Sequence, residues 1–360
     1  MLNGAIIGLG NVAVNGHLPG WEGCDRARII AAADAVESRL AQEQSRLPGA
    51  RLYTDVSAML AAEAIDFVDI CTPPGTHASL IRLALSRGLH VLCEKPLVLT
   101  PDELRLVRDA RAESGRILYT VHNWRYAPIV MQATTLIRQG QIGTVQYVSW
   151  HVYRREPSIA VQSLPSPVES ATPDPSTMLG TGNWRLDPAI AGGGILLDHG
   201  YHALYIVLDW LGEEPRTITA TLEKRRHPEW PVEDTASVQL RSSAAEANIL
   251  LTWASSSRSN CAVIEGTCGT IRIEDGTLVL KREGGEQRWT FEQPLSQGSH
   301  HPEWFRQVRD DFLREMSVAE RGGENLTMAS RCVQLLHLAK ESHSQGSKVL
   351  AVSDQRRADG

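Results

Sequence analysis

Short apolar runs alternate with helical patterns through the first 120 residues, and this alternation restricts the fold more than any other feature of the sequence. Residues 36–47, 55–63 and 76–88 have helical patterns, and another helix starts after residue 100. Strands alternating with helices in this way form βαβ units around a parallel sheet. The predicted strands lie at the N-terminus and at residues 27–33, 51–53, 65–71, 90–93 and 117–121.

A glycine-rich turn follows the first strand. The residues Gly8-Leu9-Gly10-Asn11-Val12-Ala13 form a G-x-G-x-x-A variant of the dinucleotide-binding fingerprint, although such a turn also occurs without a ligand. Asp34 ends the next strand, at about the spacing where a carboxylate meets the adenosine ribose hydroxyls. A carboxylate there repels a 2′-phosphate, so we expect NAD as the preferred cofactor. NADP stays possible, because the neighbouring Arg39 offers an opposite charge.

Polar residues also follow the later strands. Thr72-Pro73-Pro74 comes after the strand at 65–71, with Thr76 as a candidate cap and His77 in the next helix. The strand at 90–93 stops at Glu94-Lys95-Pro96. Ligands of open α/β sheets bind at the carboxyl ends of the strands, so we expect Lys95 to face a bound cofactor. The alternative is that Glu94 and Lys95 only solvate the strand end.

These motifs, in this order and spacing, resemble the Gfo/Idh/MocA oxidoreductases. The likeness continues through residues 122–128, the turn at 140–143 and the stretch from Gly192 to His202, and it covers nearly the whole chain. It implies an N-terminal Rossmann domain, a C-terminal domain on an open, mainly antiparallel sheet, and a cis Lys95–Pro96 bond. The expected cofactor contacts are Gly8, Leu9, Gly10, Asn11, Val12, Asp34, Arg39, Thr72, Pro73, Pro74, His77, Glu94, Lys95 and Asn123.

After residue 121 the pattern becomes β-rich, with short connections that suit antiparallel hairpins. We expect a Rossmann domain at 1–122, an α+β substrate-binding and oligomerisation domain at 123–345, and a tail at 346–360. Helices near 200–211, 301–320 and 327–344 are candidates to cover one sheet face, and the last is also a candidate to return to the first domain. The other face is a candidate surface for a homodimer or homotetramer. The stretch 155–182 is either a substrate lid or a surface insertion.

Asp198 and His202 are four residues apart, so in a helix they share one face. By the family resemblance His202 is the general acid/base, Asp198 orients it or relays its proton, and Lys95 polarises the reacting oxygen. The alternative is a helix cap at Asp198 and a core histidine at His202. The expected substrate contacts are Lys95, Asn123, Tyr126, Trp184, Arg185, Asp198 and His202. Arg154 and Arg155 either meet a carboxylate, a phosphate or a nucleotide sugar, or are solvated strand residues.

A metal centre is a weaker reading of Asp198, His199 and His202, or of His300 with His301, because no paired cysteines or second carboxylate cluster support it. We therefore expect no metal. The six cysteines lack paired spacing and several lie in apolar runs, so disulfides are not expected either.

Length and composition agree with these expectations. A chain of 360 residues is long for one core, which favours two domains. The net charge of −6 without a basic stripe argues against a nucleic-acid partner. No long apolar stretch or leader-like N-terminus is evident, so we expect a cytoplasmic protein without a membrane partner.

The sequence thus predicts an NAD(P)-dependent oxidoreductase acting on a secondary alcohol or ketone of a sugar, sugar derivative or cyclitol. Two alternatives remain. One is an enzyme that uses the cofactor transiently, as in NAD-dependent sugar hydrolases or lyases. The other is a cofactor- or sugar-sensing regulator without turnover, which would have no need for an acid/base pair.

Overall fold

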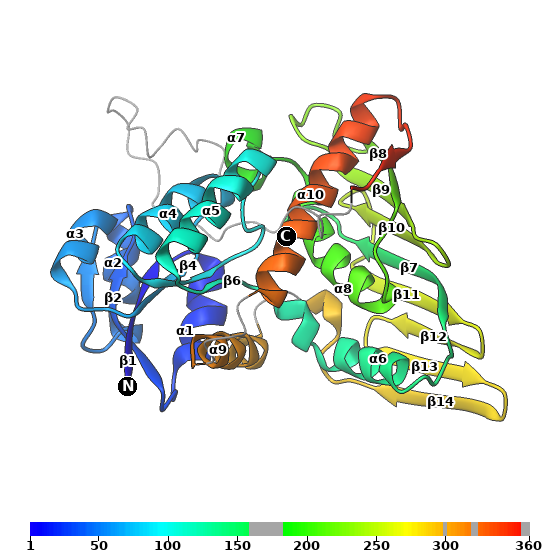
Figure 1. Ribbon diagram of the computed structural model, residues 1–360, viewed down its shortest axis with the longest axis horizontal. Coiled ribbons are helices and arrows are strands. Elements are labelled where there is room, and N and C mark those ends of the chain that lie inside the picture. The colour runs from blue at the N-terminus through cyan, green and yellow to red at the C-terminus, as the bar shows by residue number, and fades with distance from the viewer. Residues whose placement is uncertain (158–182, 298–300, 318–322, 354–360) are drawn as a thin grey trace. The chain divides into compact units, whose positions relative to one another are not determined.

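The computed structural model describes residues 1–157, 183–297, 301–317 and 323–353, and the chain divides into two compact units (Figure 1). Unit 1 consists of residues 1–121, 158–192 and 300–326, and unit 2 of residues 122–157, 193–299 and 327–360. Apart from residues 155–157, the proposed lid lies outside the described residues.

Unit 1 is built on a six-stranded parallel sheet in the order β3-β2-β1-β4-β5-β6. The central strands β4 and β5 are almost wholly buried, as expected of parallel strands covered on both faces. The predicted Rossmann architecture is confirmed. The strands are β1 (Leu2–Ile7), β2 (Ala27–Ala33), β3 (Arg51–Tyr53), β4 (Phe67–Ile70), β5 (His90–Cys93) and β6 (Leu118–Thr120).

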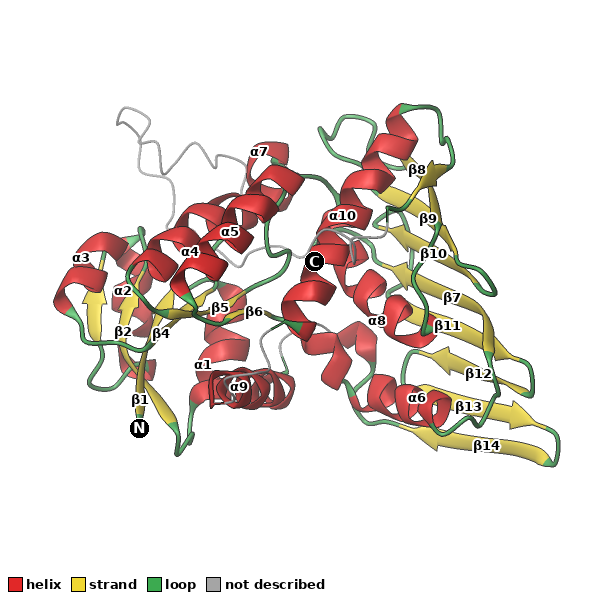
Figure 2. Cartoon of the chain, viewed as in Figure 1, coloured by secondary structure: helices red, strands yellow, loops and turns green. Residues whose placement is uncertain are grey.

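The helices and helical turns of unit 1 either connect these strands or follow the last of them along the chain (Figure 2). They are the π-helical η1 (Ala13–His17), α1 (Leu18–Trp21), α2 (Glu37–Glu43), η2 (Gln44–Arg46), α3 (Val56–Ala62), η3 (Pro74–Thr76), α4 (His77–Ser86), α5 (Pro101–Ser114), η5 (Trp184–Leu186), α7 (Pro188–Ala191) and α9 (Pro302–Ser317).

Two predicted helix caps have different outcomes. Thr100 forms the expected capping box, since its hydroxyl accepts from the Glu103 N–H and the Glu103 carboxylate accepts from the Thr100 N–H. The prediction that the Thr76 hydroxyl caps α4 is wrong. This hydroxyl donates to the Pro73 carbonyl and contacts the Thr72 hydroxyl, because the chain makes the extra turn η3 before the helix begins.

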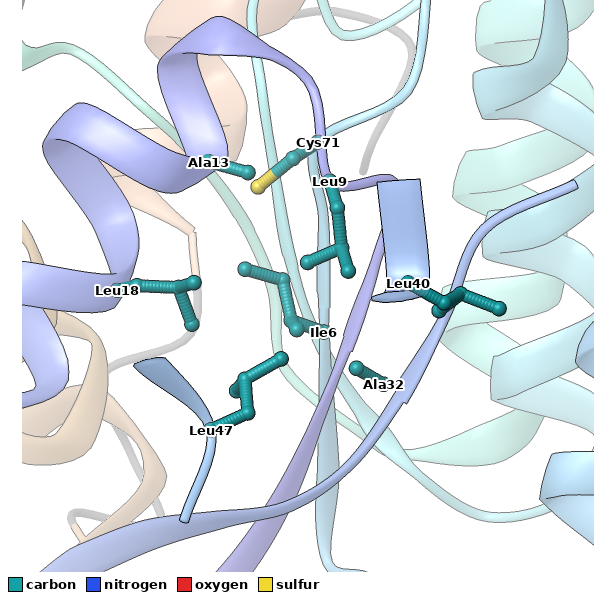
Figure 3. Close-up of a cluster of buried hydrophobic side chains, with 8 residues drawn as sticks. All are labelled: Ile6, Leu9, Ala13, Leu18, Ala32, Leu40, Leu47 and Cys71. Atoms are coloured by element: carbon teal, nitrogen blue, oxygen red, sulfur yellow. The ribbon is translucent and has the colours of Figure 1, made fainter. Parts of the chain in front are cut away.

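Aliphatic side chains from the first strands and helices form a core beside the glycine-rich turn. Ile6 and Ala32 come from neighbouring strands, and Leu18, Leu40 and Leu47 pack over them (Figure 3). Leu9, Ala13 and Cys71 complete this cluster, so the turn that begins at Gly8 rests directly on buried apolar surface.

Helix α9 packs against α1 in unit 1. The prediction that this segment covers the second sheet is therefore wrong. The reason lies in two glycines of the first helical stretch: a Cβ at Gly16 would lie 2.5 Å from the Phe305 ring, and one at Gly20 would lie 2.9 Å from the Phe305 Cβ. The missing side chains let α9 approach the backbone closely.

Unit 2 contains a nine-stranded sheet in the order β14-β13-β12-β11-β7-β10-β9-β8-β15. Only the β7–β10 pair is parallel in this sheet, which confirms the predicted mainly antiparallel character. The strands are β7 (Val145–Tyr153), β8 (Thr217–Glu223), β9 (Thr235–Arg241), β10 (Glu246–Thr252), β11 (Ser259–Gly266), β12 (Gly269–Glu274), β13 (Thr277–Arg282), β14 (Gly285–Thr290) and β15 (Leu350–Ala351).

The helices of unit 2 lie on one face of this sheet (Figure 1). Trp210 of α8 packs against Trp150 of β7, with ring centroids 5.4 Å apart. Ser342 of α10 accepts the N–H of Ala220 in β8. Asn325, which belongs to unit 1, pairs with both backbone groups of Thr120 in the edge strand β6. The helical elements are η4 (Asn123–Tyr126), α6 (Pro128–Arg138), the π-helical η6 (Leu196–Gly200), α8 (Tyr201–Leu211), η7 (Leu295–Gln297) and α10 (Glu324–Ser344).

Among the described helices, none is long and apolar enough to cross a lipid bilayer. All six cysteines have free thiols, and Cys71, Cys93 and Cys332 are buried.

Candidate functional site

The glycine-rich turn has the geometry that a dinucleotide requires. Gly8 adopts a φ of 91°, and a Cβ there would lie 2.9 Å from the Thr72 methyl group, so glycine is needed. At Gly10 a Cβ would meet no atom within 4 Å, which leaves open space above the backbone. Asn11 and Val12 begin the helical stretch that follows. These residues fit a pyrophosphate approaching a helix N-terminus.

Asp34 holds this turn from the end of β2. Its buried carboxylate accepts the Leu9 N–H at 2.7 Å and the Val36 N–H at 2.8 Å. The Arg39 guanidinium lies 3.7 Å away. A carboxylate offers about four acceptor positions, so two backbone bonds leave capacity for ribose hydroxyls. The predicted cofactor contacts at Gly8 to Val12, Asp34 and Arg39 therefore lie together.

The loop after β4 lies against the same turn. Thr72 packs on Gly8, and its carbonyl is 2.8 Å from Nε2 of His77. Nδ1 of His77 lies 2.9 Å from the Pro96 carbonyl. Burial lowers the pKa of His77, so the neutral ring donates to one of these two carbonyls. The ring thus ties the Thr72-Pro73-Pro74 loop to the segment that contains Lys95. The proposed cofactor contact of His77 stays a prediction.

Glu94, Lys95 and Pro96 form a turn at the carboxyl end of β5, and the Lys95–Pro96 bond is cis, as the resemblance implied. Glu94 is buried and its Oε2 accepts the Lys95 N–H at 2.9 Å. Its Oε1 lies 2.9 Å from Nε2 of His17. Burial alone would raise the pKa of Glu94, but the contact with His17 lowers it, so the group is a carboxylate. Lys95 itself is half-buried.

Trp184 and Arg185 belong to unit 1, in the turn η5 just before α7. The Arg185 guanidinium lies over the Trp184 ring, 4.5 Å from its centroid, and both side chains are half-buried. Helix α7 packs against η3, where a Cβ on Gly75 would lie 3.2 Å from the Ala189 carbonyl. These two predicted substrate residues therefore join the carboxyl-edge loops of the parallel sheet.

Unit 2 holds the remaining predicted site residues. Asn123 is buried and Tyr126 is half-buried in η4. The neighbouring Trp124 stacks on the His202 ring, with centroids 4.5 Å apart and an angle of 9° between the planes. Nδ1 of His202 lies 2.9 Å from the Tyr205 hydroxyl, which also accepts the Trp124 N–H at 3.0 Å. Stacking and this hydrogen bond together fix the orientation of the His202 ring.

Asp198 and His202 lie in one helical stretch, but the segment around Asp198 is the π-helical η6 rather than an ordinary α-turn. The Asp198 carboxylate lies 3.4 Å from Nδ1 of His199. Glu233 holds the start of this stretch, since its Oε1 accepts the N–H groups of Gly194 and Leu196, each at 3.0 Å. The predicted action of Asp198 on His202 stays a prediction.

Arg154 is buried rather than solvated, which settles one alternative left open by the sequence. Its guanidinium donates to the carbonyls of Tyr153 and Ser259 and to the Asn260 side chain. Burial lowers the pKa of Arg154 to about 9, and the charge of Asp198 opposes this shift. Arg155, in contrast, is exposed and binds the Ser256 carbonyl.

Four residues that hold the predicted site residues were missed from the sequence: His17 and Asp69 in unit 1, and Tyr205 and Glu233 in unit 2. His17 lies nine residues after Gly8 in a helix that reads as apolar, and Asp69 is a single acid within a buried strand. A buried charge needs a partner, so the acid in an otherwise apolar strand was the available signal for Asp69. Nothing in the sequence around Glu233 indicates that it caps a segment 39 residues away.

Among the described residues, the side chains of His17, Asp69 and Cys71 are close enough to suggest a metal site. The distances favour a hydrogen-bonded group. Nδ1 of His17 lies 2.8 Å from one Asp69 oxygen, which is a hydrogen-bond distance. Two atoms that bind the same metal ion at about 2.1 Å lie about 3 Å or more apart. Burial also raises the pKa of the Cys71 thiol, which disfavours the thiolate that a metal needs.

Comparisons with known proteins agree with this architecture. Residues 2–122 match the family described as "Oxidoreductase family, NAD-binding Rossmann fold", and residues 130–272 match the "GFO/IDH/MocA C-terminal domain". D-apiose dehydrogenase of Paraburkholderia graminis is 39% identical over 141 residues, which cover 39% of this chain and 37% of that protein. D-xylose 1-dehydrogenase (NADP(+)) 2 of Haloferax volcanii is 30% identical over 221 residues, which cover 61% and 60%.

The chain thus spans less than two thirds of the length of these curated relatives. Among solved structures, an oxidoreductase from Agrobacterium radiobacter in complex with NAD+, L-tartaric acid and magnesium has a TM-score of 0.82. It is 22% identical, with 97% of this chain and 98% of that chain covered, so it shows the fold alone. The two family matches and the two-sheet architecture together show that the chain belongs to the Gfo/Idh/MocA family of oxidoreductases.

Proposed function

We propose that this protein is an NAD(P)-dependent dehydrogenase or reductase acting on a secondary alcohol or ketone of a sugar, sugar derivative or cyclitol. The observation that carries the proposal is in unit 1. The half-buried Lys95 follows β5 at the same sheet edge as the turn at Gly8 and Gly10 and the buried carboxylate of Asp34. The groups that we assign to cofactor binding and to charge stabilisation therefore share the carboxyl edge where α/β sheets bind ligands.

The proposed chemistry assigns one task to each side chain. When bound, the nicotinamide supplies the redox capacity of the reaction. His202 takes the hydroxyl proton during oxidation and returns it during reduction, while Asp198 orients the ring or relays its proton. The Lys95 ammonium stabilises negative charge on the reacting oxygen. The stacked and hydrogen-bonded environment of His202 supports its role, because a general base must be held in one orientation.

We propose NAD as the preferred cofactor. The support is the buried Asp34 carboxylate, whose negative charge disfavours a 2′-phosphate. Arg39 lies 3.7 Å from this carboxylate and is the residue through which NADP could be tolerated. The Haloferax relative is named for NADP+ and the Agrobacterium structure holds NAD+, so membership of the family does not set this preference.

Asn123, Tyr126, Trp184 and Arg185 are the proposed substrate contacts, together with the three catalytic side chains. They combine rings with hydrogen-bonding groups, as polyol ligands require. The names of the two curated relatives, which are pentose dehydrogenases, support a sugar-type substrate. We also propose a homodimer or homotetramer formed through the sheet face of unit 2 that no described helix covers.

The test is a screen of sugars, sugar acids and inositols with purified protein and either NAD or NADP, followed by absorbance of the reduced nicotinamide. Reduction with one polyol supports the proposal and gives the cofactor preference in the same experiment. If no compound in the panel gives reduced cofactor although cofactor binding is shown separately, the proposal is contradicted. Transient cofactor use or a sensing role is then favoured.

A further inference from the structure

A histidine buried between two carboxylates lies directly behind the Lys95 turn. His17 ends η1 and is 2% exposed. Its Nδ1 lies 2.8 and 3.0 Å from the two oxygens of Asp69 in β4. Its Nε2 lies 2.9 Å from Oε1 of Glu94, immediately after β5. One ring thus bridges the ends of two neighbouring strands.

The bridge requires a charged ring. An imidazole donates from both nitrogens only when it is protonated, and both nitrogens of His17 face carboxylate oxygens. Burial favours the neutral ring, but the charge of Asp69 and its hydrogen bond raise the pKa of His17 well above its ordinary value. The group therefore holds one positive and two negative charges, and such a buried arrangement is sensitive to the loss of any member.

Further groups from α1, β4 and α9 lie around this bridge. Trp21 of α1 donates its indole N–H to Asp69 at 2.7 Å, and the Cys71 thiol lies 3.6 Å from the same carboxylate. From α9 the Phe305 ring packs on the imidazole with centroids 4.3 Å apart, whereas the Arg309 guanidinium donates to the Gly20 carbonyl. Lys95 is the further cation that acts on this group, through Glu94.

Glu94 passes this constraint to the next residue. One of its oxygens meets His17, and the other accepts the backbone N–H of Lys95 at 2.9 Å. The Glu94 side chain, which His17 holds, therefore fixes the peptide plane that contains the Lys95 N–H. On the far side of the turn, His77 lies 2.9 Å from the Pro96 carbonyl. Both flanks of Lys95 are thus supported by buried rings from other elements.

We propose that His17, bridging Asp69 and Glu94, is a positioning residue that sets the direction of Lys95. The inference rests on the proposed function for its catalytic consequence, because the orientation of Lys95 matters where it stabilises a reacting oxygen. His17 contacts neither substrate nor cofactor in this scheme. It acts through Glu94, and the network places the ammonium group within the narrow tolerance that catalysis demands.

Two variants of His17 test the positioning role. In His17→Asn the shorter amide reaches Asp69 but loses Glu94, while in His17→Gln the longer amide still reaches Glu94. We expect His17→Asn to lower kcat by about 10²-fold, the effect of a 1 Å misplacement, with cofactor Kd within a few-fold. His17→Gln should recover part of the loss. Equal, near wild-type kcat in both folded variants would overturn the inference.

A second measurement, the pH dependence of stability, tests the charged bridge without an activity assay. A histidine with a raised folded-state pKa stabilises the protein fully below its ordinary pKa of 6.5, and this stabilisation is lost as the pH rises through the folded-state value. The difference in urea midpoint between wild type and His17→Asn should therefore be largest near pH 6, at the low end of the tested range, and should shrink towards pH 10. A difference that is constant with pH would overturn the charged bridge.

His90→Asn is the matched control, since His90 is a half-buried histidine of unit 1 that accepts the Ile117 N–H at the start of β5. It should leave kcat unchanged. The two measurements also separate this inference from the proposed function. A pH-dependent stability difference without turnover on any polyol contradicts the proposed function and supports the charged bridge. Turnover that is insensitive to His17→Asn supports the proposed function and contradicts the positioning role of His17.

Discussion

Lys95 is the residue on which the proposed chemistry depends most. Replacing it with alanine removes the cation that stabilises the reacting oxygen, so we expect kcat to fall by about 10²-fold or more. Its backbone N–H, which binds Glu94, stays in place. Cofactor affinity, measured by quenching of intrinsic fluorescence, should change by no more than a few-fold.

Lys224→Ala is the matched control, because Lys224 is an exposed lysine in unit 2. It should match wild type in both measurements. If Lys95→Ala instead prevented folding, Lys95 would be structural and the catalytic assignment would be wrong.

Asp34 determines cofactor preference in this account. Replacement with alanine removes the carboxylate that we assign to the ribose hydroxyls, so NAD should weaken relative to NADP by about 10-fold, the value of one charged hydrogen bond. Both cofactors should also lose some affinity, because the Leu9 and Val36 N–H groups lose their acceptor. The ratio of the two dissociation constants is the informative quantity, and an unchanged ratio would refute the ribose contact.

Among single residues, those that belong to motifs could be predicted from the sequence, whereas those that support them could not. Asp34 was recognisable by its spacing from the glycine-rich turn, and Lys95 because it follows an apolar strand at the edge where α/β sheets bind ligands. His17 and Glu233 were not, since their partners lie 77 and 39 residues away and contact depends on the folded chain. Long-range pairings of single polar residues leave no periodic signal in a sequence.

At the scale of elements, the start of η6 is the feature most sensitive to change. A Cβ on Gly194 would lie 2.0 Å from the Glu233 carbonyl oxygen, which is backbone and has little freedom to move. Gly194→Ala should therefore lower the free energy of unfolding by about 1–3 kcal/mol. Urea unfolding followed by circular dichroism measures this loss.

Gly193→Ala is the neighbouring control. A Cβ there would meet the end of the Leu197 side chain at 2.9 Å, and a flexible side chain can shift at lower cost. This variant should be distinctly more stable than Gly194→Ala. Equal stabilities would contradict the view that Glu233 and Gly194 fix the segment carrying Asp198.

Most elements of both units were predictable because their signals are local. The Thr100 capping box, the strand at Ala27–Ala33 and the strand at His90–Cys93 appear where propensity and pattern agree. The π-helical turns η1 and η6 were not predicted, since they depend on what packs against them. The same holds for α9, whose apolar stripe does not specify which unit it will cover.

For the whole molecule, the uncovered face of the second sheet leads to a prediction about assembly. Val263 in β11 is half-buried and alternates with Ala262 and Ile264, which are buried on the helix-covered side. If copies of the chain pair through the open face, Val263→Arg buries an unpaired charge there and should give monomers.

Analytical ultracentrifugation of wild type and variant measures the assembly, with Ser256→Arg at an exposed loop position as the control. Wild type and the control should sediment as dimers or tetramers. A monomeric wild type, or a Val263→Arg variant that keeps the wild-type assembly, would contradict the proposed surface.

The central claim is that the chain carries out net oxidation or reduction of a polyol, with Lys95, Asp198 and His202 acting in one reaction. The most direct test is the stoichiometry between reduced cofactor formed and polyol consumed, measured by absorbance and by chromatography of the sugar. We predict one reduced nicotinamide per molecule of polyol oxidised. Consumption of the polyol with no accumulation of reduced cofactor would contradict it and show that the redox step is transient.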